Sequence, residues 1–502
     1  MIYQSTRGKA HEVSAAGAIV EGLASDGGLY VPQEFPAIPL DVIVGWKNAS
    51  YHQIAATIMG KYLGGFSAKE VDEMVSAAYG SRFDDDRIVP LVPLNNGEMV
   101  LELFHGPTLA FKDMALQMLP HLLVHSLQKN GVREKILILV ATSGDTGKAA
   151  LEGFCDVSDT AIQVFYPEGG VSPAQLRQMN TQRGENVAVT AVKGNFDDTQ
   201  NGVKGIFSDR DFAKTIAEKG YRFSSANSIN WGRLLPQIAY YFGAYAQAMA
   251  NGRIQAGAPL NFVVPTGNFG NILAGYYAKQ MGLPVAKLIC ASNRNNVLTD
   301  FFAKGMYDRK RSFYQTTSPS MDILISSNLE RLLFEITGRD CQQVCDWMKA
   351  LQEKGEYQLS EEQRGKIAAD FDAGYASDED GKACIQQIWE KEGYLLDTHT
   401  AVAQCVYEQY RERTGDATPT VLVSTASPFK FAADVLDAIA PEKRAAIDPQ
   451  DAFEAADALA ETTRMAVPKG IDELRILPVL HKDVVAADDM PAAVLHALTQ
   501  WK

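Results

Sequence analysis

The sequence predicts an α/β protein whose sheets are largely parallel and covered by helices on both faces. Apolar runs of strand length recur along the chain, as in Lys135–Ala141, which reads KILILVA, and in Leu260–Val264 and Val285–Ala291. These runs are apolar at nearly every position, which indicates strands that are buried on both faces. Helical segments separate the runs, and this alternation is typical of parallel sheets. In such sheets ligands bind at the carboxyl ends of the strands, where the loops into the next helices meet.

Length and composition limit the kinds of protein that this chain can be. Its 502 residues are enough for two or three domains, and 46% hydrophobic with 22% charged residues is ordinary for a globular protein. A net charge of −14 argues against a nucleic-acid or anionic-membrane partner but allows an anionic small-molecule substrate. The N-terminal residues lack the apolar core of a signal peptide, and no run of about 18 apolar residues occurs. We therefore expect a cytoplasmic protein with no membrane partner.

The six cysteines are scattered, with no CxxC pair and no histidine at zinc-finger spacing. Cys341 and Cys345 lie one helical turn apart, and we expect two thiols on one helix face. The cysteines therefore predict reduced thiols in an intracellular setting, and the sequence predicts no metal site.

Residues 1–95 predict a mostly helical N-terminal domain. A turn and a short strand are expected in Gly22–Pro32, and amphipathic helices follow Trp46 and Ser67. Ser67 and Glu70 have the spacing of a capping box, in which each side chain satisfies a free N–H group of the helix start.

Residues 96–440 carry the alternation of strands and helices. Residues 305–390 interrupt this alternation with a charge-rich segment of helical character, which we interpret as an insertion or as part of a second lobe. Residues 441–502 predict a helical tail. Further strands are expected at Met99–Phe104, Ala161–Tyr166, Val187–Val192 and Pro419–Val423. Helices are expected from Gly147 and at Arg233–Ala250, Ile272–Met281, Thr398–Tyr410 and Pro428–Ile439.

The segment Leu101–Asp113, which reads LELFHGPTLAFKD, joins a strand to a helix and carries a lysine at the junction. We expect Asp113 to cap the helix that follows. Lys112 would then lie at the positive end of that helix and beside Phe111, and both surroundings lower the pKa of an amine. Such a lysine is a plausible Schiff-base nucleophile. Taken alone, it is more often a solvated lysine at a helix start.

Three other strand-to-helix loops are rich in hydrogen-bond donors. Pro265–Asn271 reads PTGNFGN and suits a phosphate, because its glycines let backbone N–H groups point inward at a helix start. Ala141–Lys148 reads ATSGDTGK and could bind a second anion, with a turn capped by Asp145 as the structural alternative. In Val423–Lys430, which reads VSTASPFK, a hydroxyl at the strand end could donate to a ring nitrogen or only cap the turn.

Together these four loops fit a phosphorylated aldehyde cofactor. The lysine would take the aldehyde, the Gly-Asn loop the phosphate and a neutral hydroxyl the pyridine nitrogen, which leaves the second donor loop for the substrate. This is the division of labour that pyridoxal 5'-phosphate requires.

Seven segments, in order along the chain, resemble the threonine synthase family of pyridoxal-phosphate enzymes, which have the tryptophan-synthase-β fold type. They are YQSTRG (Tyr3–Gly8), DGGLYVP (Asp26–Pro32), LFHGPTLAFKD (Leu103–Asp113), TSGDTG (Thr142–Gly147), NSINWGR (Asn227–Arg233), PTGNFGN (Pro265–Asn271) and STASP (Ser424–Pro428). The resemblance implies a fold type II architecture of two lobes, with parallel or mixed sheets covered by helices and a helical N-terminal domain.

The resemblance also implies an activity and a set of site residues. The substrate would be O-phospho-L-homoserine, converted with water to L-threonine and phosphate by γ-elimination and β-hydration, in a monomer or homodimer. Lys112 would carry the cofactor and act as the catalytic base, and Thr425 would face its ring nitrogen. The cofactor phosphate would be held by Gly267, Asn268, Phe269, Gly270 and Asn271, and the substrate phosphate by Ser143, Thr146, Lys148 and Arg233. Two residues depart from the family pattern, which often has histidine at Ser427 and proline at Thr398.

Three alternatives stay open at this point. Another enzyme of the fold type, a threonine dehydratase or a cysteine synthase, would need no pocket for a substrate phosphate. A non-catalytic member of the family would be expected to lack the lysine or the Gly-Asn loop, and both are present. An α/β protein with capped turns and no cofactor is the third. The sequence assigns no role to His105.

Overall fold

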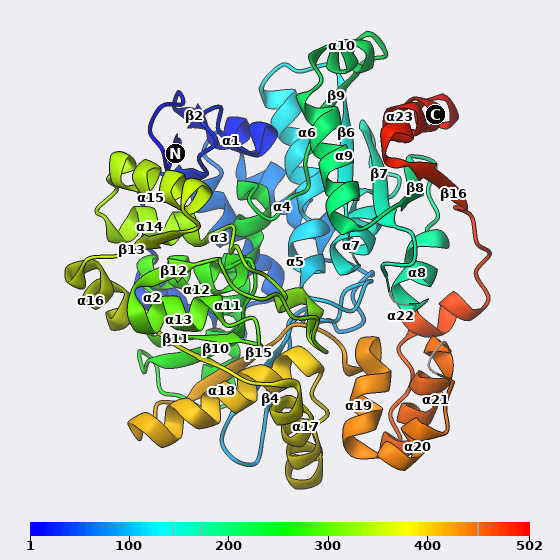
Figure 1. The fold of residues 1–502 in the computed structure, drawn as a ribbon. Coiled ribbons are helices and arrows are strands. Elements are labelled where there is room, and N and C mark those ends of the chain that lie inside the picture. Colours follow the sequence, from blue (N-terminus) through cyan, green and yellow to red (C-terminus); the bar gives the residue numbers. More distant parts are fainter. Residues whose placement is uncertain (143, 172, 449–450, 502) are drawn as a thin grey trace.

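The structure is a computed structural model that describes residues 1–142, 144–171, 173–448 and 451–501 (Figure 1). Two sheets, each covered by helices, make up two lobes, and the N-terminal residues pack against the helices between them (Figure 1). The α/β class and the fold of parallel and mixed sheets are as predicted. No helix in the described part of the chain is long and apolar enough to cross a membrane.

The larger sheet has the strand order β14-β11-β10-β15-β5-β4, and its neighbours are parallel except for the antiparallel pair β4 and β5. Along β10, Phe262 and Val264 belong to one hydrophobic core and Val263 to another, because successive side chains point to opposite faces of a covered sheet. This explains why the strand is apolar at every position except Asn261. The strands are β4 (Leu91–Pro93), β5 (Met99–Glu102), β10 (Leu260–Pro265), β11 (Val285–Ser292), β14 (Phe371–Tyr375) and β15 (Thr420–Ser424).

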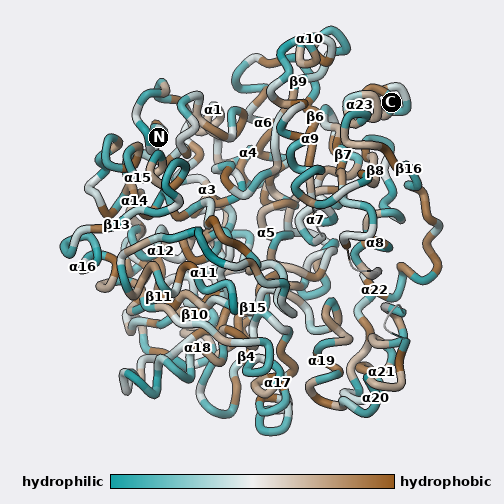
Figure 2. The backbone as a smooth tube through the Cα atoms, viewed as in Figure 1, coloured by the Kyte–Doolittle hydropathy of each residue, from teal (hydrophilic) through white to brown (hydrophobic). Residues whose placement is uncertain are grey.

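The smaller sheet has the order β16-β8-β7-β6-β9 and all its pairs are parallel. Its central strands are mostly apolar, as the brown segments in Figure 2 show, whereas outer helices such as α16 (Glu361–Asp370) are largely polar. The strands are β6 (Lys135–Ala141), β7 (Thr160–Pro167), β8 (Val187–Lys193), β9 (Tyr221–Ser224) and β16 (Asp483–Ala486). The helices around them are α7 (Asp145–Phe154), α8 (Pro173–Asn180), α9 (Phe196–Ser208), α10 (Arg210–Glu218) and α23 (Met490–Gln500).

Helix α11 (Trp231–Ala250) is buried along almost its whole length and packs against helices from several parts of the chain. Its partners include α3 (Tyr51–Tyr62), α5 (Lys112–Leu116), α6 (Leu119–Lys129) and α12 (Gly270–Gln280). Because one face of α11 meets α3 and another meets α12, the N-terminal region shares a core with the larger lobe. The other N-terminal elements are β1 (Ile2–Ser5), β2 (Val13–Ser14), α1 (Ala15–Glu21), β3 (Tyr30–Pro32), α2 (Leu40–Gly45), η1 (Trp46–Asn48) and α4 (Ala68–Ala78). The capping box of Ser67 and Glu70 is present at the start of α4.

Strands of both large sheets lie in regions where the sequence predicts helices. In the 305–390 region, β14 pairs with β11 at the edge of the larger sheet, and in the 441–502 tail, β16 pairs with β8 at the edge of the smaller one. Both are edge strands with mostly half-buried or exposed side chains, so they lack the apolar run by which buried strands are found. The tail is therefore not purely helical. The domain boundaries at residues 95 and 440 stay predictions.

The remaining elements of the C-terminal half are mostly helical. The antiparallel pair β12 and β13 joins the helices of the 305–390 region, and the helix predicted over Pro428–Ile439 is divided into η3 and α19. These elements are α13 (Val297–Lys304), β12 (Met306–Asp308), η2 (Pro319–Met321), α14 (Leu329–Ile336), α15 (Cys341–Glu353), β13 (Glu356–Gln358), α17 (Asp378–Glu392), α18 (Thr398–Thr414), η3 (Pro428–Phe431), α19 (Ala432–Ile439), α20 (Pro441–Ala445), α21 (Ala452–Thr463), α22 (Lys469–Asp472), η4 (Glu473–Arg475) and η5 (Ala487–Asp489).

Candidate active site

Lys112 is the first residue of α5, so the helix begins one residue earlier than predicted. The prediction that Asp113 caps this helix is wrong. The carboxylate of Asp113 is fully buried and accepts hydrogen bonds from the N–H group and the hydroxyl of Thr108, each at 2.8 Å. Both donors belong to Thr108, which precedes the helix. The carboxylate of Asp113 therefore stabilises the turn that leads into α5 and does not cap the first turn of the helix. Asp113 thereby fixes the backbone from which Lys112 projects.

The Lys112 turn is attached to the carboxyl end of β15. The N–H group of Phe111 donates to the carbonyl oxygen of Thr425 at 2.8 Å, and the N–H group of Ser427 donates to that of Leu109 at 3.0 Å. The segments that carry Lys112 and Thr425 are therefore adjacent in the structure, at the carboxyl end of β15. Thr425 is buried, and its role toward a ring nitrogen stays a prediction.

The amine of Lys112 lies in a closed polar site. Its Nζ atom donates to Oγ of Ser320 at 3.1 Å, lies 3.9 Å from Oδ2 of Asp145 and stands over the ring of Phe111, 5.3 Å from its centroid. Burial lowers the pKa of Lys112 to about 8; Asp145 opposes this shift, whereas Lys430 adds to it. An amine with this pKa has a substantial neutral fraction at neutral pH, as a nucleophile requires.

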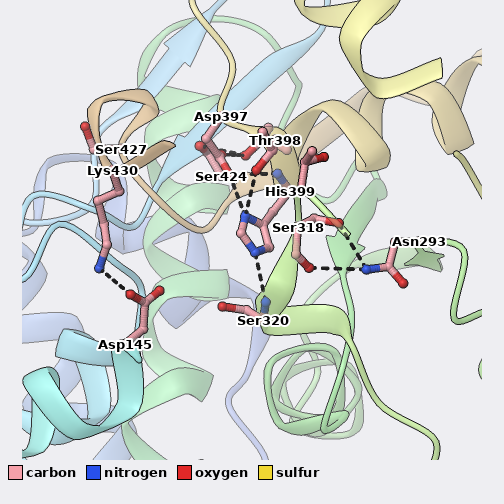
Figure 3. Close-up of polar contacts among 12 residues, drawn as sticks. Asp145, Asn293, Ser318, Ser320, Asp397, Thr398, His399, Ser424, Ser427 and Lys430 are labelled. Carbon is pink, nitrogen blue, oxygen red and sulfur yellow. Dashed lines mark hydrogen bonds and ion pairs between the residues drawn. The ribbon is translucent and has the colours of Figure 1, made fainter. Parts of the chain in front are cut away.

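Asp145 connects Lys112 to a second buried lysine. Nζ of Lys430 lies 2.8 Å from Oδ1 of Asp145 and donates to the carbonyl oxygen of Thr108 at 2.9 Å (Figure 3). Burial by itself would raise the pKa of Asp145, but Lys430 and Lys112 hold it well below its usual range. Asp145 is the first residue of α7, and its Oδ1 atom accepts from Nε2 of Gln175 at 3.1 Å as well as facing Lys430. The sequence pattern did not single out Lys430.

The Gly267–Asn271 loop joins β10 to α12 and packs directly against Ser320. A Cβ atom on Gly267 would lie 2.6 Å from the carbonyl oxygen of Ser320, so no larger residue fits there without a shift of the backbone. The carbonyl of Gly267 accepts from Oγ of Ser326 at 2.7 Å, and that of Asn268 accepts from the N–H group of Asn328 at 3.1 Å. These bonds turn the carbonyls outward at a helix start, where the first N–H groups have no partner within the helix.

Asn271 presents an unused donor in this loop. Its Oδ1 atom accepts from the hydroxyls of Tyr240 at 2.6 Å and Tyr241 at 2.9 Å, both on α11. Its Nδ2 atom is buried and has no hydrogen-bond partner within the described part of the chain. A buried unpaired donor costs about 1–3 kcal/mol, so Nδ2 of Asn271 is available to a ligand bound at this loop.

The four residues predicted to bind the substrate phosphate have different surroundings. Arg233, in the first turn of α11, is buried, and its Nε atom has no partner among the described residues. Burial lowers the pKa of Arg233 to about 10. The ammonium of Lys148 is held by Glu152 at 3.0 Å and Gln182 at 2.5 Å. Thr146 is half-buried in the first turn of α7, and Ser143 lies outside the described residues.

Sequence reasoning missed the group of side chains behind Ser320. His399 accepts a hydrogen bond at Nε2 from the N–H group of Ser320 at 3.2 Å, and its Nδ1 atom lies 3.0 Å from Oδ1 of Asp397 (Figure 3). Ser320 lies in η2, within the 305–390 region, and no catalytic motif in the sequence marked it. His399 appeared in the sequence only as the neighbour of Thr398.

Comparison with known proteins agrees with this geometry. Residues 87–426 match the family model described as a pyridoxal-phosphate-dependent enzyme, residues 2–79 match the threonine synthase N terminus and residues 400–472 match the threonine synthase C-terminal region. The threonine synthase of Pseudomonas aeruginosa is 42% identical over 86% of this chain and 89% of its own length. The chain belongs to the threonine synthase family. The predicted family, fold type and cofactor class are thereby confirmed.

Other members of the threonine synthase family extend the comparison. The threonine synthase of Saccharomyces cerevisiae is 38% identical over 87% of this chain and 89% of its own length. The crystal structure of a pyridoxal-phosphate-bound threonine synthase from Brucella melitensis matches with a TM-score of 0.87 and 38% identity, covering 100% of both chains. A human protein named threonine synthase-like 1 is 42% identical over 84% of this chain and 57% of its own length.

Proposed function

We propose that this chain is a threonine synthase that converts O-phospho-L-homoserine and water to L-threonine and phosphate, the last step of threonine biosynthesis. The observation that carries the proposal is the buried amine of Lys112, with its pKa of about 8, beside a Gly-Asn loop that holds an unpaired donor. Membership in the threonine synthase family supports the same reaction.

The residues present fit pyridoxal 5'-phosphate. Gly267 lets the loop pack directly against the backbone of Ser320, and Nδ2 of Asn271 is a buried donor without a partner among the described residues, as suits a phosphate loop. Lys112 would hold the aldehyde carbon and Thr425 would face the ring nitrogen. The phosphate would be held by Gly267, Asn268, Phe269, Gly270 and Asn271. When bound, the cofactor supplies an aldehyde that takes amines and a conjugated ring that withdraws electrons from the substrate.

Lys112 would move the protons of the reaction. Once its amine is free, the neutral form can accept the proton from the substrate α-carbon. The ammonium so formed must release that proton before the amine can accept one from the β-carbon. The nearby Asp145, 3.9 Å from Nζ, is the counter-charge for the protonated form. The ring of Phe111 covers one side of the amine and limits the access of bulk water to it.

The charge of the site suits a phosphorylated substrate. Lys112, Lys430 and Arg233 are cationic, whereas Asp145 is the carboxylate held ionised among them. Burial raises the pKa of the second carboxyl, Asp113, to about 7, which lessens its negative charge. Arg233, with an unpaired Nε atom, is the best placed of the predicted ligands for the departing phosphate. Lys148, whose ammonium is engaged by Glu152 and Gln182, is the weaker candidate.

The alternatives differ from this proposal at identifiable residues. A dehydratase or cysteine synthase would not use Arg233 for a substrate phosphate. A non-catalytic member of the family would be expected to lack the lysine or the Gly-Asn loop, and both are present in this chain. Lys112, buried beside Asp145 and Lys430, favours catalysis. The six free cysteines also favour the cytoplasmic setting expected from the sequence.

The test is release of phosphate and formation of threonine from O-phospho-L-homoserine by the wild type beside Lys112→Ala, with the exposed Lys214→Ala as a matched control. Equal amounts of both products from the wild type and the control, and none from Lys112→Ala, would support the proposal. Phosphate accompanied by 2-oxobutyrate would contradict the hydration step, and 2-oxobutyrate from threonine itself would favour a dehydratase.

A further inference from the structure

We propose that Ser320, His399 and Asp397 position the amine of Lys112, an inference that rests on the function proposed above. Ser320 lies 208 positions from Lys112 in the chain, yet its hydroxyl accepts the hydrogen bond from Nζ at 3.1 Å. Such a contact orients the amine and the lone pair that would take substrate protons. Ser320 therefore touches a reacting atom, whereas His399 and Asp397 act through Ser320.

The hydrogen bond between Ser320 and His399 fixes the state of the histidine. A backbone N–H group can only donate, so Nε2 of His399 must be the unprotonated acceptor at 3.2 Å. The ring proton is then on Nδ1, which donates to Oδ1 of Asp397 at 3.0 Å. The arrangement requires a neutral imidazole in one tautomer, because a second ring proton would face the N–H group of Ser320.

Asp397 is itself held from several sides. It is fully buried, its Oδ1 atom also accepts from the N–H group of His399 at 2.8 Å, and its Oδ2 atom accepts from the hydroxyl of Thr400. The ring of His399 packs against Phe431, with centroids 4.8 Å apart. Because every polar atom of the pair has a defined partner, the position of Nε2 is determined by packing and hydrogen bonding together.

The turn that carries Ser320 is also fixed at its other end. Nδ2 of Asn293 donates to the hydroxyl of Ser318 at 3.1 Å and to its carbonyl oxygen at 3.2 Å (Figure 3). The carbonyl oxygen of Ser320 faces Gly267, where a Cβ atom would lie 2.6 Å away. Ser320 thus lies between Lys112 and the phosphate loop, so a shift of its backbone would change the distance between the two parts of the cofactor site.

Three variants test the positioning. Ser320→Ala removes the acceptor for Lys112, and His399→Leu removes the acceptor for the N–H group of Ser320. His399→Gln is the conservative change, because the glutamine side-chain oxygen is as many bonds from Cα as Nε2 and can accept the same hydrogen bond. The first readout is the rate at which acetic anhydride modifies Lys112 in the cofactor-free full-length chain, measured by mass spectrometry beside Lys214. The second readout is kcat and KM of the loaded enzyme.

We expect Lys112 to react about threefold faster or more in Ser320→Ala and His399→Leu, because loss of the acceptor frees the amine and favours its neutral form. In the loaded enzyme kcat should fall about tenfold in both with little change in KM, since a displaced base slows chemistry more than binding. His399→Gln should resemble the wild type in both readouts, and Lys214 should react equally in all four proteins.

Two results would overturn the positioning. One is a His399→Leu chain whose Lys112 reacts at the wild-type rate, and the other is a His399→Gln chain as impaired as His399→Leu, which would mean that the imidazole itself is needed. A wild type that releases no threonine from O-phospho-L-homoserine would refute the proposed function alone. The labelling rates in the cofactor-free chain would still decide whether Ser320 and His399 position Lys112.

Discussion

The ammonium of Lys430 and the carboxylate of Asp145 lie 2.8 Å apart, with side-chain exposures of 4% and 6%. A second pair in the protein, Lys214 and Asp211, has the same separation of 2.8 Å but is largely exposed to solvent, with side-chain exposures of 74% and 92%. The two pairs therefore differ in burial and not in distance. This makes the exposed pair a matched control for the buried one.

Asp145→Asn should destabilise the protein by about 3 kcal/mol or more, because it leaves the buried ammonium of Lys430 without its counter-charge. The pKa of Lys112 should fall below about 8, since Asp145 opposes the lowering that burial causes. Urea unfolding measures the first effect, and the pH dependence of Lys112 modification measures the second. Asp211→Asn should change stability by less than about 0.5 kcal/mol. Equal losses in the two variants would show that burial does not set the strength of the pair.

Gly267→Ala should weaken cofactor binding. The added Cβ atom would lie 2.6 Å from a backbone oxygen of Ser320, so the loop must shift. We expect at least a tenfold rise in the cofactor dissociation constant, which corresponds to about 1.4 kcal/mol. Absorbance of the bound cofactor after gel filtration would report it. Gly60→Ala is the control: Gly60 lies within α3 with nothing near its missing Cβ, and the change should be neutral or slightly stabilising. Full cofactor retention by Gly267→Ala would contradict the assignment of this loop.

Arg233→Lys should lower kcat/KM for O-phospho-L-homoserine by about tenfold, because lysine keeps the charge but cannot form the two parallel hydrogen bonds of a guanidinium. Lys148→Met should instead lower stability while leaving KM near the wild-type value, since the ammonium of Lys148 already bonds Glu152 and Gln182. Steady-state kinetics with both variants separates the two predicted phosphate ligands. A KM that rises more for Lys148→Met than for Arg233→Lys would show that Lys148 is the main ligand of the substrate phosphate.

His105→Gln should reduce stability at neutral pH in a way that disappears in alkali. Nδ1 of His105 lies 2.5 Å from Oδ1 of Asp84, and its Nε2 atom lies 2.7 Å from Oε2 of Glu102. Burial acts to lower the pKa of His105, but the two carboxylates raise it to about 9, above the ordinary value of 6.5. Because the pKa of His105 is higher in the folded than in the unfolded protein, its protonation adds to the free energy of unfolding. This contribution is complete below pH 6.5 and is lost as the pH rises through 9.

We therefore expect His105→Gln to lose on the order of 2 kcal/mol of unfolding free energy at pH 6, and progressively less between pH 6.5 and 9. Urea unfolding at several pH values measures the difference. His121, whose pKa is lowered to about 4 chiefly by burial, provides a contrasting histidine that should show no loss of this kind above pH 6. A constant difference between wild type and His105→Gln from pH 6 to 10 would contradict the ion-pair explanation.

The sequence predicts buried strands well and edge strands poorly, for a physical reason. β6 and β10 are covered on both faces, so nearly every side chain along them is apolar, apart from Lys135 and Asn261, and the run is visible without a structure. β14 and β16 have one free edge and exposed side chains, so their residues carry no such pattern. The same logic limits the site. Lys112 and Thr425 each follow a strand. Because parallel strands end at the same edge of a sheet, their proximity could be anticipated from the sequence.

The parts of the site that could not be predicted depend on contacts between distant turns. Ser320 reaches Lys112 only because η2 is held by Asn293 on one side and His399 on the other, and no local pattern encodes that arrangement. Asp113 looked like a helix cap because its position suits one, but Thr108 offers two donors that outcompete the helix start. Lys148 looked available because a sequence cannot show that Glu152 and Gln182 occupy its ammonium.

The pairing of β16 with β8 means that the chain visits the smaller sheet twice, first with β6 to β9 and again near its end, after the whole larger sheet. During synthesis from the N-terminus, β8 is therefore made long before the strand that covers it. Its free edge must stay unpaired until Asp483–Ala486 leave the ribosome, and such an edge invites pairing with other chains. Completion of the smaller lobe therefore depends on a strand made about 290 residues after β8, and ribosome-stalled chains ending before residue 483 would expose an incomplete sheet to chaperones.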